Sequence, residues 1–377
     1  MIKVYLDWNC ITHSKDKFAQ LKKLLEQYKY VFICPYSIAH LRDVQKNRKG
    51  NDKEYERDLD LLTEICGKHL LLIEDNRIRL LNANPRDYLV GVEKPLGYLQ
   101  NKFAFPYFDI RKIVQSHIPQ ELLHRISIEN DPKKVFPLIN KEIENYSLPL
   151  WNISSELNNL ETQIRQEYYF LDLMGYRKED KNKSFANIDT DAQHITYAGM
   201  CDYLITDDRR MRDKAKSIFH KYRCVTKVLS PESFIVEIPK IVQKCFDEEL
   251  IHLTMQKYGL PTMQEDGAHL KKMEYPLWGL FNFCYTLDSV AYPNRAIFFT
   301  KGFMFYDEFL TIVTILSVFF PKLEYENYMQ SYIQSKQIED FAFSMNCSKG
   351  VYHFVLTKFE GLPALKVQFI AKQDDIN

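Results

Sequence analysis

The chain has 377 residues, of which 46% are hydrophobic and 27% are charged. This composition excludes a mainly disordered protein, and the length predicts two domains. Fifty lysines and arginines balance fifty aspartates and glutamates. A net charge of zero argues against a protein that coats nucleic acid through bulk charge, although a local basic groove would still fit.

The sequence lacks the motifs of several common classes of site. It has no glycine-rich dinucleotide or P-loop motif, no G-x-S-x-G elbow, no H-E-x-x-H and no C-x-x-C among its eight cysteines. The first residues do not read as a signal peptide, and the longest apolar run, 309–320, is shorter than the roughly 20 residues that span a bilayer. We therefore expect a reduced, cytoplasmic protein with no membrane partner.

Residues 1–240 alternate short apolar runs with amphipathic segments. The amphipathic segments, such as 18–28 and 209–219, place apolar residues at helical spacing. The apolar runs are nearly uninterrupted, as in strands buried on both faces of a parallel sheet. They are Val4–Leu6, Tyr30–Cys34, His69–Ile73, Tyr203–Thr206 and Cys224–Leu229. The alternation predicts an α/β domain in which helices flank a parallel sheet.

A stretch from about residue 85 to residue 185 interrupts this alternation. It contains helical patterns at 110–118, 135–146 and 155–173, with prolines around them. We expect a helical insertion lying across the sheet. The sequence Asp-Lys-Asn-Lys-Ser at 180–184 predicts a flexible turn before the next sheet element.

Residues 245–377 have a different character, because aromatic residues crowd together there. The pattern predicts a buried helix at 308–322 and a hairpin formed by 352–359 and 364–370. We expect a C-terminal α+β accessory domain whose aromatic rings fit a core better than a base-stacking surface. Binding of a protein partner and self-association through this domain remain alternatives.

Acidic residues gather around the ends of the predicted strands in the first domain. Asp7 follows the first apolar run and Asp208 follows the fourth. Asp43 lies in the helix after the second run, and Asp191 lies at the start of the helix that leads into the fourth. Ligands of open parallel sheets bind beyond the carboxyl ends of the strands, so these four side chains should meet at one edge.

Carboxylates gathered in one cleft repel one another unless protons or cations neutralise them. Mg²⁺ and Mn²⁺ prefer such oxygen ligands and also bind phosphate oxygens. A single aspartate at a strand end is more often a turn or helix cap. The joint pattern nevertheless predicts metal-dependent hydrolysis of phosphodiester bonds.

Two parts of the sequence resemble the PIN-domain nucleases. Residues 5–9, Tyr-Leu-Asp-Trp-Asn, are similar to the Asp-x-Asn opening of that family. Residues 189–208 resemble its later half, with a helix that begins at an aspartate, an alanine seven residues on and a strand that ends in Thr-x-Asp. Residues 228–234 are similar to its closing segment. The resemblance covers about residues 1–75 and 185–240 and implies a PIN-like fold.

The resemblance also implies a nuclease that acts mostly on RNA, uses Mg²⁺ or Mn²⁺ and leaves a 5′-phosphate. Asp7, Asp191 and Asp208 match the acidic metal positions, and Asn9 and Thr206 match polar positions beside them.

The family's second acid is commonly a glutamate early in the helix after the second strand, and this sequence has none there. We choose Asp43, which lies one helical turn beyond His40 on the same face. His40 would then orient a ligand or contact substrate. Asp189 and Asp207 are reserve candidates, since adjacent acids leave the register open.

Arg209 and Arg210 begin a basic cluster after Asp208 that would suit positioning of phosphate, although a solvated helix face explains it equally well. For His194 we favour a hydrogen-bonded structural role. The leading hypothesis is a metal-dependent endoribonuclease, in the setting of a toxin or defence effector. The alternatives are a catalytically inactive PIN-like scaffold that binds RNA or protein, and a structure-specific DNA nuclease.

Overall fold

The structure is a computed structural model that describes residues 2–29, 31–47, 52–74, 77–90, 107–146, 160–180, 183–245, 269–277, 279, 281–286, 295–299, 341–347, 350–359 and 362–371. Residues 3–27 and 33–236 form one compact unit, and residues 1–2, 28–32 and 237–377 form a second. The sequence had placed this boundary between residues 240 and 245. No helix in the described part of the chain is long and apolar enough to cross a membrane.

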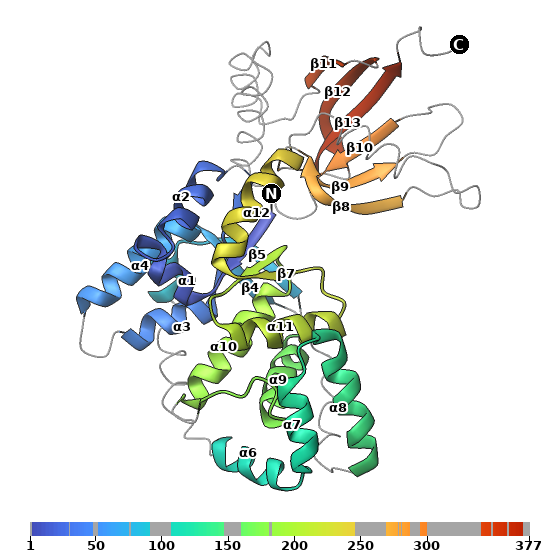
Figure 1. Cartoon of the computed structure of the whole chain (residues 1–377). Coiled ribbons are helices and arrows are strands. Elements are labelled where there is room, and N and C mark those ends of the chain that lie inside the picture. The colour runs from blue at the N-terminus through green and yellow to red at the C-terminus, as the bar shows by residue number, and fades with distance from the viewer. Residues whose placement is uncertain are drawn as a thin grey trace. The chain divides into compact units, whose positions relative to one another are not determined.

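A parallel sheet organises the first unit (Figure 1). Its strands are β1 (Ile2–Leu6), β2 (Phe32–Ile33), β6 (Tyr203–Ile205) and β7 (Lys227–Leu229), in the order β2-β1-β6-β7. β6 pairs in parallel with both β1 and β7. Val4, Leu204 and Ile205 are fully buried, which explains why these strands appear in the sequence as continuous apolar runs. The unit is therefore α/β, as expected, with helices flanking the sheet.

The expectation that residues 69–73 belong to this parallel sheet was wrong. β4 (His69–Glu74) lies in a separate three-stranded sheet between β3 (Tyr36–Ser37) and β5 (Arg77–Asn82). β3 pairs with β4 in parallel, whereas β5 returns antiparallel to β4 along its whole length. The alternation of arginine and apolar residues at 77–80 is the period-two signal of this last strand, which the sequence interpretation missed.

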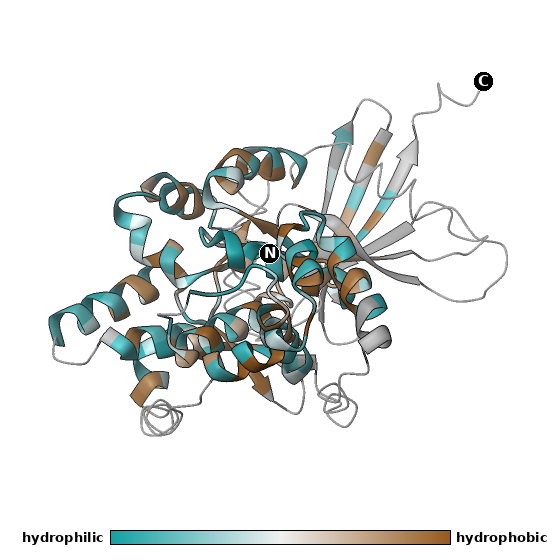
Figure 2. Ribbon diagram, turned by 60° about the horizontal axis from the view of Figure 1, so that its bottom comes forward, coloured by the Kyte–Doolittle hydropathy of each residue, from teal (hydrophilic) through white to brown (hydrophobic). Residues whose placement is uncertain are grey.

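Helices cover the sheet and carry the residues that matter below. They are α1 (Trp8–Thr12), α2 (Ala19–Gln27), α3 (Ile38–Asn47), α4 (Asp52–Cys66), α10 (Phe185–Ala198), α11 (Arg209–Lys221) and α12 (Pro231–Cys245). Several helices carry hydrophobic residues along one side and hydrophilic residues along the other (Figure 2), and α2 and α11 have this amphipathic pattern. α10 differs because it is buried over most of its surface, from Ile188 to Ala198. This burial places α10 in the centre of the unit, where polar residues such as Thr190, Gln193 and His194 are buried as well.

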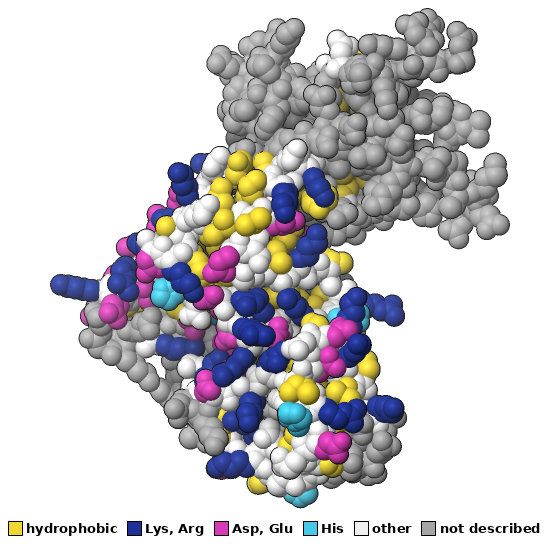
Figure 3. Space-filling view, in the orientation of Figure 1, with side chains coloured by type: hydrophobic (Ala, Val, Ile, Leu, Met, Phe, Trp, Pro, Cys, Tyr) yellow, Lys and Arg dark blue, Asp and Glu magenta, His cyan; other side chains and the backbone are white. Residues whose placement is uncertain are grey.

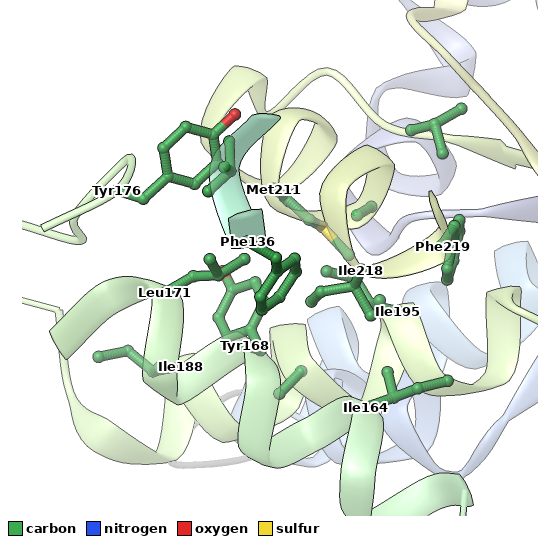
Figure 4. Close-up of a cluster of buried hydrophobic side chains, with 14 of the residues drawn as sticks. Phe136, Ile164, Tyr168, Leu171, Tyr176, Ile188, Ile195, Met211, Ile218 and Phe219 are labelled. Carbon is green, nitrogen blue, oxygen red and sulfur yellow. The ribbon is translucent and has the colours of Figure 1, made fainter. Parts of the chain in front are cut away.

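The expected helical insertion consists of α6 (Tyr107–Ser116), α7 (Gln120–Ile128), α8 (Pro132–Tyr146) and α9 (Leu160–Leu173). Residues 91–106 and 147–159 lie outside the described part of the chain. The insertion shares one hydrophobic core with α10 and α11. Figure 4 shows Phe136 of α8, Tyr168 of α9, Ile195 of α10 and Ile218 of α11 in this core. The insertion is therefore packed into the unit that holds the sheet.

An antiparallel sheet accounts for the described strands of the second unit. Its strands are β8 (His269–Leu277), β9 (Phe281–Thr286), β10 (Arg295–Phe299), β11 (Phe341–Cys347), β12 (Gly350–Phe359) and β13 (Leu362–Ala371), in the order β11-β12-β13-β10-β9-β8. β12 and β13 form the expected hairpin, with Phe354 opposite Val367 and both buried. The helix expected at 308–322 lies outside the described residues.

Candidate functional site

A cavity of about 240 Å³ in the first unit brings the four predicted acids together. Asp7, Asp43, Asp191 and Asp208 all line it, and so does Asn9. The other lining residues are Trp8, Lys46, Lys183, Asn187 and Met211. The acids come from four segments that are far apart in the sequence, as the strand-end argument had predicted.

Asp7 and Asp208 meet because β1 and β6 are parallel neighbours in register, with Leu6 opposite Ile205. Thr206, the residue after β6, is fully buried and connects the two acids. Its hydroxyl donates to Asp7 Oδ2 at 2.9 Å and accepts the backbone N–H of Asp208 at 3.1 Å. This threonine therefore sets the position of both carboxylates, close to the role expected for it.

Both of these acids also cap helices. The carboxylate of Asp7 accepts the backbone N–H of Trp8 at the start of α1. Asp208 Oδ1 accepts the backbone N–H groups of Arg210 and Met211 at the start of α11. Capping therefore explains part of their placement. It leaves oxygen lone pairs of both carboxylates available on the cavity side, because each oxygen can accept more than one hydrogen bond.

The carboxyl group of Asp7 is in an unfavourable setting for a charge. Only 4% of the residue is exposed. Burial raises the pKa of Asp7, and the negative charges of Asp43 and Asp208 raise it further, while His194 and the hydrogen bond from Thr206 act in the opposite direction. A cation in the cavity would relieve this repulsion.

Asp43 is held by two cationic or potentially cationic groups. Its Oδ2 lies 2.8 Å from His194 Nε2, and its Oδ1 accepts from Lys46 Nζ at 2.7 Å. Burial acts to raise the pKa of Asp43, but His194 and Lys46 outweigh it, so the pKa is lowered. The pKa of His194 is correspondingly raised, because Asp43 more than offsets the effect of burial. The pair therefore favours an imidazolium facing a carboxylate.

A buried polar network continues from this pair toward the sheet. His194 Nδ1 is hydrogen-bonded with the Tyr5 hydroxyl at 2.8 Å, and that hydroxyl is bonded with Ser37 Oγ at 2.6 Å. His194 is thus a structural histidine, as expected, and it also orients one acid of the cavity.

His40 does not have the role expected for it. It is fully buried and does not line the cavity. Its Nε2 lies 2.8 Å from the Leu6 carbonyl, and its Nδ1 accepts the backbone N–H of Ser37. Burial, followed by the positive charge of His194, lowers the pKa of His40 to about 3. The residue is a neutral support that packs against the ring of His194 at a centroid distance of 4.8 Å.

Asp191 forms an ion pair with Lys183 at the wall of the cavity. Burial raises the pKa of Asp191 to about 7, against the lowering effect of Lys183 and together with the charges of Asp7 and Glu179. Lys183 also binds Glu179, with Nζ and Oε2 3.0 Å apart. Burial thus disfavours the charged form of Asp191, which already has one cationic partner in Lys183.

The remaining predicted residues lie outside the cavity. Arg210 pairs with Asp180, and Arg209 is exposed on α11. Of the reserve acids, Asp189 binds Arg42, Arg165 and Tyr169, and Asp207 pairs with Lys17 at 2.6 Å. Neither reserve acid is needed to complete the group of four.

Two lysines of the cavity, Lys46 and Lys183, were not predicted. Lys46 lies three residues after Asp43 on one helix, a spacing that predicts the ion pair. Lys183 lies in the segment interpreted as a flexible turn, and its contact with Asp191 has no local signal. Lysine and arginine side chains also gather on the face of this unit where α10 and α11 lie (Figure 3), and α11 contributes several of them.

The cavity contains the oxygen ligands that a hard cation prefers, but these ligands are not already arranged around a single metal position. Among the described residues, no three histidine, cysteine, aspartate or glutamate side chains lie close enough together to hold one metal ion. Two of the four acids are paired with lysines instead. Comparisons of the chain with protein-family models, with curated proteins and with solved structures gave no match.

Proposed function

We propose that this chain is a metal-dependent endonuclease of PIN-like architecture, acting on RNA in preference to DNA, with its active site in the acidic cavity. The observation that carries the proposal is the meeting of Asp7, Asp43, Asp191 and Asp208 in one cavity beside the carboxyl ends of parallel strands. The resemblance of residues 1–75 and 185–240 to PIN-domain nucleases supports it independently. The preference for RNA rests on that resemblance alone.

The residues present suit Mg²⁺ or Mn²⁺ in their chemistry. Aspartates and the asparagines Asn9 and Asn187 line the cavity, and their side chains carry the oxygen ligands that hard divalent cations prefer. The raised pKa of buried Asp7 marks a place where a positive charge would be favourable. When bound there, such a cation would activate water and offset negative charge on the phosphate.

The chain's own residues have distinct parts in this proposal. Thr206 fixes Asp7 and Asp208, while His194 fixes Asp43 through a hydrogen bond from a buried ring. The exposed Asn9 lies at the cavity and is placed to contact substrate. Holding the ligands on helices and strand ends keeps them in one geometry, which a catalytic centre requires.

A second candidate is a catalytically inactive PIN-like scaffold that binds RNA or protein. The ion pairs of Lys46 with Asp43 and of Lys183 with Asp191 favour it, because they neutralise half of the acidic group without a metal. Activity measurements distinguish the two candidates.

The test is cleavage of single-stranded RNA, single-stranded DNA and duplexes by the full chain, with Mg²⁺, with Mn²⁺ and with a chelator. We expect metal-dependent cleavage of RNA, lowered by about 100-fold or more in Asp7→Asn and in Asp191→Asn. Asp207→Asn is the matched control, since it removes a partly exposed carboxylate that lies outside the cavity and pairs with Lys17.

Three results would change the proposal. Cleavage that survives both the chelator and the two cavity substitutions contradicts the assignment of the site. Preferential cleavage of DNA junctions or flaps would replace the RNA substrate with a structured DNA. Binding of RNA without cleavage under any metal condition would favour the scaffold.

A further inference from the structure

Lys183 is placed where a cation of the proposed active site would be expected. Its ammonium group contacts the carboxylate of Asp191 inside the cavity, and only 22% of its side chain is exposed. The residue lies immediately before Ser184, whose hydroxyl caps α10 by accepting the backbone N–H of Asn187. The backbone that carries Lys183 is thus fixed at the start of the helix that carries Asp191.

A second carboxylate holds the same ammonium group. Glu179 is 2% exposed and its Oε2 lies 3.0 Å from Lys183 Nζ. Glu179 is itself fixed, because its Oε1 accepts from Lys214 Nζ at 2.9 Å and from the Tyr168 hydroxyl at 2.8 Å. Lys183 is therefore held by the buried Glu179 on one side and by Asp191 of the cavity on the other.

This arrangement extends into a line of alternating charges. Lys214 is completely buried and also contacts Asp172, with Nζ and Oδ1 3.3 Å apart. Arg111 of the insertion donates to Asp172 Oδ2 at 3.1 Å. Three cations and three anions thus alternate from Arg111 to Asp191, and the ammonium of Lys183 is the last positive charge before the cavity.

We propose that Lys183 occupies the cation position at Asp191 and competes with the divalent cation for that carboxylate. This inference rests on the proposed function, which assigns Asp191 to the metal. The ammonium group of Lys183 holds Asp191 Oδ2, so a cation that uses this oxygen must displace Lys183, while Lys183 keeps its contact with Glu179. Displacement therefore breaks one of the two ion pairs, so Lys183 lowers the affinity of the site for the cation without preventing binding.

The test is calorimetric titration of the full chain with Mg²⁺ and with Ca²⁺, without nucleic acid, at about pH 8.5, because a basic pH favours ionised carboxylates. We expect Lys183→Met to bind the cation roughly tenfold more tightly than the unsubstituted chain, since it removes one competing half-buried ion pair. Lys178→Met is the matched control, because Lys178 is exposed and does not line the cavity.

Lys183→Gln is the second variant, and thermal unfolding of each protein establishes that it is folded. One outcome would refute the competition alone: the unsubstituted chain binds the cation, Asp7→Asn does not bind it, and neither Lys183 variant binds it more tightly than Lys178→Met. The proposed function would then stand. If neither the unsubstituted chain nor the folded Lys183 variants bind either cation, the metal site itself is refuted. If Lys178→Met increased the affinity for the cation as much as the Lys183 variants do, the change in net charge would explain the effect, and the competition would be refuted.

Discussion

Lys214 offers a sharp test of the buried charges, because the same helix carries a matched control. Its side chain is completely buried against Asp172 and Glu179, which are buried as well. Lys216, two residues along α11, is exposed. Substituting each lysine with methionine keeps an unbranched side chain and a similar helix propensity, so the difference between the two variants isolates the buried charge.

The expected loss of stability in Lys214→Met arises because Asp172 and Glu179 would lose a buried cationic partner. Removing one partner of a buried ion pair costs about 3–5 kcal/mol in free energy of unfolding. Burial acts to raise the pKa of Glu179, but Lys214 and Lys183 outweigh it and lower that pKa from 4.5 to about 2. A shift of this size contributes about 3 kcal/mol at neutral pH, and Lys183 supplies part of it. We therefore expect Lys214→Met to destabilise the first unit by about 3 kcal/mol.

The pH dependence has a definite sign. A carboxyl with a lowered pKa in the folded state stabilises the fold above its ordinary pKa, and this contribution is lost as the pH falls. For Glu179 that loss extends from about pH 4.5 down to about pH 2. The difference between Lys214→Met and the unsubstituted chain should therefore be largest near neutral pH and should shrink on acidification.

Urea unfolding followed by far-ultraviolet circular dichroism measures this difference, because the helices of the described residues lie mainly in the first unit. Lys216→Met should lie within about 0.5 kcal/mol of the unsubstituted chain. Equal losses in the two variants, a loss below about 1 kcal/mol in Lys214→Met, or a difference that grows on acidification would refute the reasoning.

Two further substitutions test the cavity. Asp191→Asn should stabilise the fold above pH 7, by about 4 kcal/mol at most, because it removes a carboxyl whose pKa burial raises to about 7. The gain should vanish toward pH 4, and thermal unfolding across this range measures it; a gain independent of pH would contradict the assignment. Thr206→Val should lower both the proposed nuclease activity and the stability, since both Asp7 and the N–H of Asp208 lose a partner. Thr206→Ser should retain both, and equal defects in the two variants would contradict the role of the hydroxyl.

The meeting of the acids could be predicted from the sequence because it depends only on the order and direction of the strands. Once β1 and β6 are recognised as parallel neighbours, Asp7 and Asp208 must lie at the same edge of the sheet. The α/β class of the first domain could also be predicted, because apolar runs alternate with amphipathic segments along the sequence. Such features follow from local pattern and from the rules of strand connection.

The partners of the acids could not be predicted in this way. The contact of His194 with Asp43 joins residues 151 positions apart, and the contact of Lys183 with Asp191 depends on how Glu179 is held. His40 was misjudged because a histidine near a predicted site gives no sign of burial, whereas its ring bonds to the Leu6 carbonyl. These contacts depend on packing between elements, which local sequence patterns do not specify.

The line of alternating charges makes the helical insertion difficult to remove by protein engineering. A shortened first unit made by excising residues 85–175 would lose Arg111 and Asp172 and leave Lys214 with Glu179 as its remaining carboxylate partner. It would also expose the apolar faces of α10 and α11 that the insertion covers. A shortened protein would therefore need an apolar residue at position 214 and a redesigned surface on both helices.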